Sequence, residues 1–169
     1  MTQARLEQLY DAHASGLFRY LVSVVKREAD ARDLLQELFS KVAREYRPDT
    51  IQQEKAWIYR VAHHLALDWL RRNQTRQAYE LRAVEAASPL FAAAQDPDAQ
   101  ALARQLEEAM AALPEEQRRV TQLKLWEGLT FEEIAEAQQI PANTAASRYR
   151  YALEKLRTLL RPLYEELKQ

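Results

Sequence analysis

The sequence predicts an all-α protein of two small helical domains joined by a flexible linker. Glycine occurs only twice and proline six times in 169 residues, which is too few turn formers for a sandwich or barrel of many short strands. Apolar residues recur at steps of three and four along both halves of the chain, the spacing of amphipathic helices. Between the halves, residues 82–100 hold two prolines and show no clean period, so we predict that they form the linker.

The first half, residues 1–81, is predicted to contain three amphipathic helices. Their apolar stripes cover residues 6–25, 31–46 and 57–70. The second helix is expected to end at Arg47, because the residue before a proline is pushed out of the helical region. A polar, exposed loop is predicted from Pro48 to about Gln53.

The second half, residues 101–169, contains several signals for helix ends. Pro114 ends one helix and opens the next, and Gly128 closes that second helix. Thr130 and Glu133 have the spacing of a capping box, and a last, basic helix begins after Pro141. A short helix, a tight turn and a longer basic helix follow the plan of a helix-turn-helix, whose second helix enters the major groove. An ordinary αα-hairpin in a bundle is the alternative interpretation.

Several function classes are excluded or disfavoured by composition. The chain has no cysteine, which excludes disulfides, cysteine nucleophiles and Cys-type zinc sites. It has no glycine-rich phosphate loop, and the adjacent His63 and His64 point about 100° apart on a helix, so they cannot share a metal. We therefore expect no enzymatic activity, no cofactor and no metal. The longest uncharged stretch, 137–147, is too short for a membrane span and the N-terminus lacks a signal peptide. We expect a cytoplasmic protein without stable membrane association.

The charge distribution indicates contact with a polyanion. The formal net charge is −1, yet residues 57–79 carry +3, residues 141–161 carry +4 and residues 101–136 carry −4. Each basic stretch alone could be a solvated helix face. Two basic helices separated by acidic ones favour two distinct contacts with nucleic acid.

Two sets of motifs, one in each half, occur together. The second half holds ALP-x-x-x-R, then EGLT (127–130), then EEIA (132–135), and then Thr144 and Ser147-Arg148. The first half holds LYDAHASGLFRYL, EADARDLLQELFSKV and AWIYRVAHHLALDWLRR. The former set resembles the C-terminal DNA-binding domain of sigma-70 family sigma factors, and the latter resembles the second conserved region of that family. With only these two domains and a short linker, the chain resembles the extracytoplasmic-function (ECF) class.

This resemblance implies a bacterial transcription initiation factor that binds core RNA polymerase, recognises promoter DNA at the −10 and −35 elements, and promotes DNA opening. It also allows an anti-sigma factor as a partner. The polar stripe that matches the family's polymerase-docking stripe consists of Asp33, Gln36, Glu37 and Ser40. The −10 and melting residues would be Trp57, Arg60, His64, Arg71, Arg72 and Arg76, beside a base pocket formed by the loop at 48–54. The −35 residues would be Asn143, Thr144, Ser147, Arg148 and Arg150.

The sequence departs from the family pattern at three places. Ala146 stands where most members have lysine, Gln138-Gln139 replaces the usual Leu-Gly of the turn, and Arg32 stands where an acidic residue is frequent. The turn residue therefore either tolerates or avoids the left-handed conformation that glycine allows.

Two alternatives from other classes remain. One is a one-component helix-turn-helix repressor whose N-terminal helical domain binds a ligand or dimerises. It is disfavoured because a ligand pocket does not require an exposed polar row such as Asp33, Gln36 and Glu37. The other is a structural helical adaptor, which leaves the two basic helices unexplained.

Overall fold

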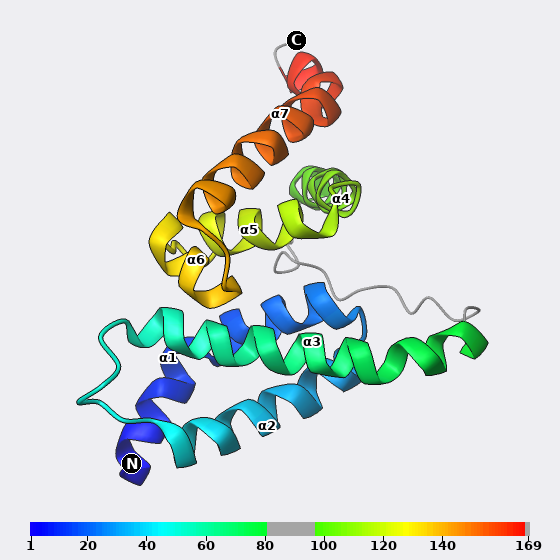
Figure 1. Ribbon diagram of the computed structural model, residues 1–169. Helices are drawn as coiled ribbons and strands as arrows, with labels where there is room; N and C mark the ends of the chain where they lie inside the picture. Colours follow the sequence, from blue (N-terminus) through cyan, green and yellow to red (C-terminus); the bar gives the residue numbers. More distant parts are fainter. Residues whose placement is uncertain (81–96, 168–169) are drawn as a thin grey trace.

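The computed structural model describes residues 1–80 and 97–167, and within these ranges every regular element is a helix (Figure 1). The helices are α1 (Gln3–Val25), α2 (Glu28–Glu45), α3 (Glu54–Glu80), α4 (Pro97–Ala111), α5 (Glu115–Leu125), α6 (Phe131–Gln138) and α7 (Ala142–Leu167). The all-α prediction is confirmed. Most of the predicted linker lies outside the described residues, while 97–100 belong to α4.

Helices α1, α2 and α3 form a bundle in which each helix contacts the other two. The Thr2 hydroxyl caps α1 by accepting a hydrogen bond from the Arg5 amide at 3.4 Å. Lys26 ends α1 in the left-handed conformation, with φ 66°, a position that glycine adopts more easily. The apolar sides of the three helices meet in a core that includes the fully buried Leu17, Leu38 and Ile58.

Helices α5, α6 and α7 form the predicted helix-turn-helix with its preceding helix, and α4 packs against α7. The capping box is present, since the Glu133 amide donates to the Thr130 hydroxyl at 3.1 Å and the Thr130 amide donates to the Glu133 carboxylate at 2.7 Å. Gly128, with φ +65°, supplies the left-handed residue after α5. The turn between α6 and α7 passes through Gln139 with φ 52°, so this glutamine tolerates the conformation expected of glycine.

The two halves pack against each other (Figure 1). Helix α6 lies on α3, and α5 lies against α1. The main apolar core accordingly continues from the first half into the second through Val120, Leu123, Leu129 and Ile134. A smaller cluster, which includes Met110, joins α4 to α7. The sequence predicted two separate domains and did not anticipate a core shared between them.

Candidate polymerase and promoter interfaces

The predicted polymerase-binding stripe is exposed along α2. Asp33, Gln36, Glu37 and Ser40 are all solvent-accessible, whereas the intervening Leu34 and Leu38 are buried. Helix α2 packs against α1 and α3 and lies on the side of α3 away from α6 (Figure 1). The stripe is therefore a continuous polar surface that packing between the halves leaves open.

The predicted −35 residues lie in the first turns of α7. Asn143 and Arg150 are exposed, and Thr144 and Ser147 are half-buried. Ala145 is fully buried and anchors this part of the helix in the main core. The Arg150 guanidinium lies 5.0 Å from the ring centroid of the exposed Tyr151. This face presents small polar side chains and one exposed cationic side chain, that of Arg150. The combination suits close approach to a DNA groove.

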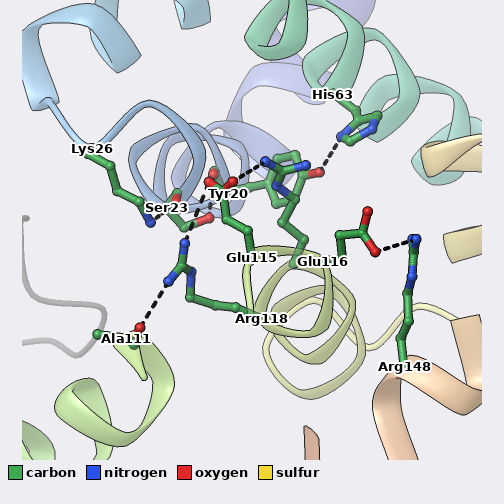
Figure 2. A network of polar contacts seen from close by, with 10 residues as sticks. Tyr20, Ser23, Lys26, His63, Ala111, Glu115, Glu116, Arg118 and Arg148 are labelled. Atoms are coloured by element: carbon green, nitrogen blue, oxygen red, sulfur yellow. Dashed lines mark hydrogen bonds and ion pairs between the residues drawn. The ribbon is translucent and has the colours of Figure 1, made fainter. Parts of the chain in front are cut away.

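Arg148, the other predicted −35 cation, already has a carboxylate partner. Its guanidinium pairs with Glu116 of α5 at 2.5 Å, and its side chain is 25% exposed (Figure 2). The sequence analysis did not predict this pairing, because the two residues come from different helices. To contact a phosphate, Arg148 must leave Glu116 or share it.

The predicted −10 residues Arg60, His64, Arg71, Arg72 and Arg76, together with Asp68, form a polar ridge along α3 that is divided into two parts. Arg71 and Arg72 are exposed. The Arg71 guanidinium donates to the Asp68 carboxylate at 3.3 Å, and the Arg72 guanidinium donates to the Asp68 backbone carbonyl at 3.3 Å. Arg76 also lies in α3, but its side chain is outside the described part of the chain. This end of the ridge is open to solvent.

The other part of the ridge is covered, although a DNA contact requires an exposed surface. The Arg60 guanidinium lies 3.4 Å from the Glu136 carboxylate of α6, and the His64 Nε2 lies 2.9 Å from the Gln139 side-chain oxygen. Both α3 residues are only half-exposed. Helix α6 and the turn after it therefore cover the beginning of the predicted strand path.

The loop before α3 is fixed at its ends by residues that the sequence analysis did not single out. Glu54 accepts hydrogen bonds from Arg5, at 2.5 Å, and from the Tyr46 hydroxyl. Trp57 packs edge-on against the Tyr46 ring, with centroids 5.8 Å apart. Residues 47–50 between these anchors are exposed. Trp57 is thus half-buried in packing contacts, at the base of the loop that was predicted to hold a flipped base.

A buried carboxylate joins the two halves. Glu127 accepts hydrogen bonds from the Tyr59 hydroxyl at 2.5 Å and from Arg19 at 3.1 Å, and its backbone carbonyl accepts one from Lys55. Its side chain is 8% exposed. We call the four residues around it, Gly16, Arg19, Lys55 and Tyr59, the Glu127 socket. Burial and the adjacent carboxylate raise the pKa of the Tyr59 phenol.

Glutamates usually lie on solvated surfaces, and the sequence analysis did not single out Glu127 as a buried one. One signal was available. Gly16 lies inside a helix, where glycine is unfavourable relative to alanine, and its position indicates a close approach by another group.

A second polar region lies between α1 and α5 (Figure 2). Tyr20 and the Nδ1 of His63 are 2.8 Å apart and buried, and burial, reinforced by nearby Arg119, lowers the pKa of His63 to about 4. Burial and the neighbouring Arg118 lower the pKa of Lys26 to about 8. Cations of both halves therefore face one another here, with Glu115 between them pairing with Arg119 at 3.1 Å.

The described ranges contain no group of three or more His, Cys, Asp or Glu side chains that could hold a metal ion. In these same ranges, no helix has the length and apolar character that crossing a membrane requires.

Each half of the chain matches a known protein family. Residues 9–76 match the family Sigma-70 region 2, and residues 103–156 match the family Sigma-70, region 4. The chain is 34% identical to RNA polymerase sigma factor CarQ of Myxococcus xanthus, over 98% of this chain and 94% of that protein. It is 30% identical to ECF RNA polymerase sigma factor SigX of Bacillus subtilis, over 94% of this chain and 85% of that protein.

Two solved structures share the fold over nearly the whole chain. The sigma factor RpoE of Bartonella quintana, in complex with the anti-sigma factor NepR, gives a TM-score of 0.72 at 22% identity and covers 92% of this chain and 96% of its own. CnrH, in complex with the cytosolic domain of CnrY, gives a TM-score of 0.67 at 20% identity. This match covers 95% of this chain and 90% of the CnrH chain. Both conserved regions are present in order, and the curated relatives match along nearly the full chain. The chain therefore belongs to the sigma-70 family of RNA polymerase sigma factors, in its extracytoplasmic-function class.

Proposed function

We propose that the chain directs transcription initiation through three separate surfaces, one for polymerase and two for promoter DNA. As a sigma factor it binds core RNA polymerase and directs it to promoters. The observation that supports the residue assignment is that the α2 stripe, the C-terminal part of the α3 ridge and the first turns of α7 are all solvent-accessible. The first two surfaces belong to the domain 1–81 and the third to the domain 101–169.

The α2 stripe is the proposed polymerase contact. Asp33 and Glu37 provide two carboxylates one helical turn apart, and Gln36 and Ser40 provide neutral hydrogen-bonding groups beside them. None of these side chains is used in packing, so their polarity is available for an intermolecular interface.

The first turns of α7 are the proposed −35 contact. Asn143 and Ser147 can hydrogen-bond base edges or phosphates, and Arg150 can neutralise a phosphate or read a guanine. Ala146 brings the helix axis close to the DNA, although it removes the cation that the family pattern places there. Thr144 and Arg148 complete this surface.

The α3 ridge is the proposed path of the −10 strand. Arg71 and Arg72 are exposed and contact only Asp68 of their own helix among the polar contacts described above, and Arg76 follows on the same helix. The loop at 48–54, which is exposed at residues 48–50 and 52–53 and has Trp57 at its base, is the proposed site for a base taken out of the stack. This arrangement would guide a single strand along the helix after the duplex opens.

We infer no catalytic activity for the chain itself, since these surfaces bind and position nucleic acid and polymerase. An anti-sigma factor is a further proposed partner. Because polymerase and promoter DNA lie in the bacterial cytoplasm, we expect the protein to act there.

The polymerase contact provides the first test. Asp33→Arg combined with Glu37→Arg should abolish binding to core RNA polymerase in a pull-down while the helical circular dichroism signal stays intact. Glu7→Arg combined with Asp11→Arg is a matched control on α1, with the same spacing, exposure and change of charge, and should bind like the wild type. Unchanged binding by the α2 variant would show that polymerase docks elsewhere on the chain.

A further inference from the structure

We propose that Arg5, in the first turn of α1, is a positioning residue for base selection at the −10 element, because with Tyr46 and Glu54 it ties together the two ends of the loop between α2 and α3. We call these three residues the loop clasp. The inference rests on the proposed role of the loop at 48–54 as the base site and deepens it. It brings α1, which contributes no residue to the proposed DNA surfaces, into promoter recognition.

The loop clasp joins three helices at one end of the bundle. The beginning of α1 and the loop between α2 and α3 lie at this end (Figure 1). Arg5 Nη2 donates to the Glu54 carboxylate at 2.5 Å and to the Tyr46 hydroxyl at 3.4 Å, and this hydroxyl donates to the same Glu54 oxygen. Tyr46 directly follows α2, and Glu54 is the first residue of α3. The chain therefore enters and leaves the loop through one closed set of mutual contacts.

The segment inside the loop has hydrogen bonds of its own. The Arg47 carbonyl accepts from the Thr50 and Ile51 amides, both at 3.1 Å, and from the Thr50 hydroxyl at 3.2 Å. Ile51 packs against the main core. The turn is thus a compact unit of the kind found in surface loops whose ends lie close together. Its orientation relative to α3 depends on its two ends, and the loop clasp fixes both.

The loop clasp also fixes the aromatic pair at the base of the loop. The Tyr46 ring stands edge-on to Trp57, and the Arg5 guanidinium lies 6.0 Å from the centroid of the Tyr46 ring. The Tyr46 hydroxyl accepts from Arg5 while it donates to Glu54, so the ring cannot turn without breaking one of these bonds. Selection between bases needs groups held within about 0.5 Å of their productive positions. Arg5 supplies that restraint from outside the loop.

Arg5 has an electrostatic effect at the same point. The Glu54 side chain is 28% exposed and that of Arg5 is 42% exposed, so both lie at the surface where a strand would approach the loop. An unpaired carboxylate there would repel the phosphates of the strand. The ion pair cancels this charge and keeps Glu54 directed at Tyr46. Arg5 therefore favours strand approach without contacting the base.

The loop clasp contributes little to the stability of the bundle. Ion pairs with this degree of exposure stabilise folded proteins only slightly, and the three helices already share the buried core around Leu17, Leu38 and Ile58. Removal of Arg5 should therefore loosen the loop and leave the fold intact. The expected defect is a loss of discrimination between bases rather than a loss of the protein.

The test uses holoenzyme assembled from the full chain and core RNA polymerase. It transcribes duplex promoters randomised at both elements, and a barcode in each transcript identifies its promoter. Arg5→Ala and Tyr46→Phe should each reduce the base preference of at least one −10 position about fivefold, the factor expected from one net hydrogen bond. Base preferences at the −35 element should stay unchanged in the same reactions. Arg5→Lys should keep most of the −10 preference, because a single nitrogen of Arg5 makes both contacts.

Arg32→Ala is the matched control. Arg32 is exposed, its guanidinium lies 3.5 Å from a carboxylate and 6.0 Å from the centroid of an aromatic ring, and it is roughly 20 Å from Tyr46 along α2. Its variant should keep the preferences at both elements. Thermal melts establish that all variants fold. An equal loss of transcription from every promoter in Arg5→Ala, with unchanged −10 preferences, would overturn the positioning role.

A loop variant separates this inference from the proposed function. Asp49→Ala combined with Gln52→Ala and Gln53→Ala removes exposed polar side chains of the loop itself. If this variant keeps every −10 preference of the wild type, the assignment of the loop as the base site fails. If it changes the −10 preferences while Arg5→Ala and Tyr46→Phe do not, the base site stands and the loop clasp is refuted.

Discussion

Gln139 and His64 are 75 residues apart in the sequence and meet across the boundary between the halves, with the glutamine oxygen 2.9 Å from the imidazole Nε2. Gln139 makes this contact from a left-handed backbone conformation, φ 52°, in which a side chain is unfavourable. The family pattern has glycine at this turn. The contact between α6 and α3 is therefore made at a position where the chain departs from its family.

Replacing Gln139 with glycine tests which of two effects on the free energy of unfolding is larger, the strain of the left-handed turn or the contact between the halves. Gln139→Gly relieves the left-handed strain, worth about 1 kcal/mol, and removes an exposed hydrogen bond of smaller net value. We expect the free energy of unfolding in urea to rise or stay level. Gly128→Ala is the reverse change at φ +65° with no atom within 4 Å of the added Cβ, and it should lower the free energy of unfolding by about 1 kcal/mol. A loss of stability in Gln139→Gly would show that the His64 contact outweighs the strain.

His63 should make the protein less stable in mild acid. Its folded pKa of about 4 lies below the ordinary value of 6.5, so between these values the unfolded chain binds the proton and the folded chain does not. Stability is then fully present above pH 6.5 and declines as the pH falls toward 4, by roughly 3 kcal/mol in total. The groups that face the imidazole are Tyr20 of α1, Arg119 of α5 and the adjacent His64, and none of them supplies a carboxylate to favour the charged form.

The corresponding measurement is the urea midpoint from pH 7 to pH 4 for the wild type and for His63→Gln, which keeps a polar group beside Tyr20 without titrating. The variant should show a shallower decline. His13, whose pKa is also lowered by burial, contributes in the same direction, and His13→Gln is the control for its share. Parallel curves for the wild type and His63→Gln would refute the assignment to His63.

The pairing of Arg148 with Glu116 should weaken its contribution to DNA binding. Glu116→Gln frees the guanidinium and should increase affinity for a −35 duplex. Alanine at Arg148 or at Arg150 should reduce the salt slope by about one unit if the contact is to phosphate, with the larger loss of affinity at the unpaired Arg150. Fluorescence anisotropy at several salt concentrations measures both quantities, and Glu132→Gln, the same change on an exposed glutamate of α6, is the control. Identical slopes in all variants would mean that this face of α7 does not meet the DNA.

Charge reversal at the open end of the α3 ridge should block melting selectively. Arg71→Glu with Arg72→Glu should leave polymerase binding intact and abolish open-complex formation, because the displaced strand loses its phosphate contacts. Permanganate reactivity of unpaired thymines on a duplex promoter reports opening. Arg157→Glu with Arg161→Glu, two basic residues on α7 outside the proposed contacts, is the control. Wild-type thymine reactivity in the Arg71/Arg72 variant would remove this ridge from the mechanism.

The candidate surfaces were predictable to different degrees. The α2 stripe was predictable because its polar and apolar positions alternate within one helix, so local periodicity decides which side chains are exposed. The division of the α3 ridge was not, since Arg60 and His64 have the same periodicity as Arg71 and differ only in having α6 above them. Arg148 lies in the last helix, as its apolar spacing predicts, but its partner Glu116 comes from another helix that no local pattern connects to it.

The sequence by itself determined the helices, because caps, breakers and apolar spacing act over a few residues. Pro114 opens α5, the capping box of Thr130 and Glu133 starts α6, and Gly128 takes the left-handed position between them. Only the tertiary structure decided how the halves meet. The Glu127 carboxylate and the space above Gly16 are separated by more than a hundred residues, as the 108-residue spacing of the Arg19 contact shows. Such a fit depends on the shapes and hydrogen-bonding groups of both surfaces at once, and neither half displays it alone.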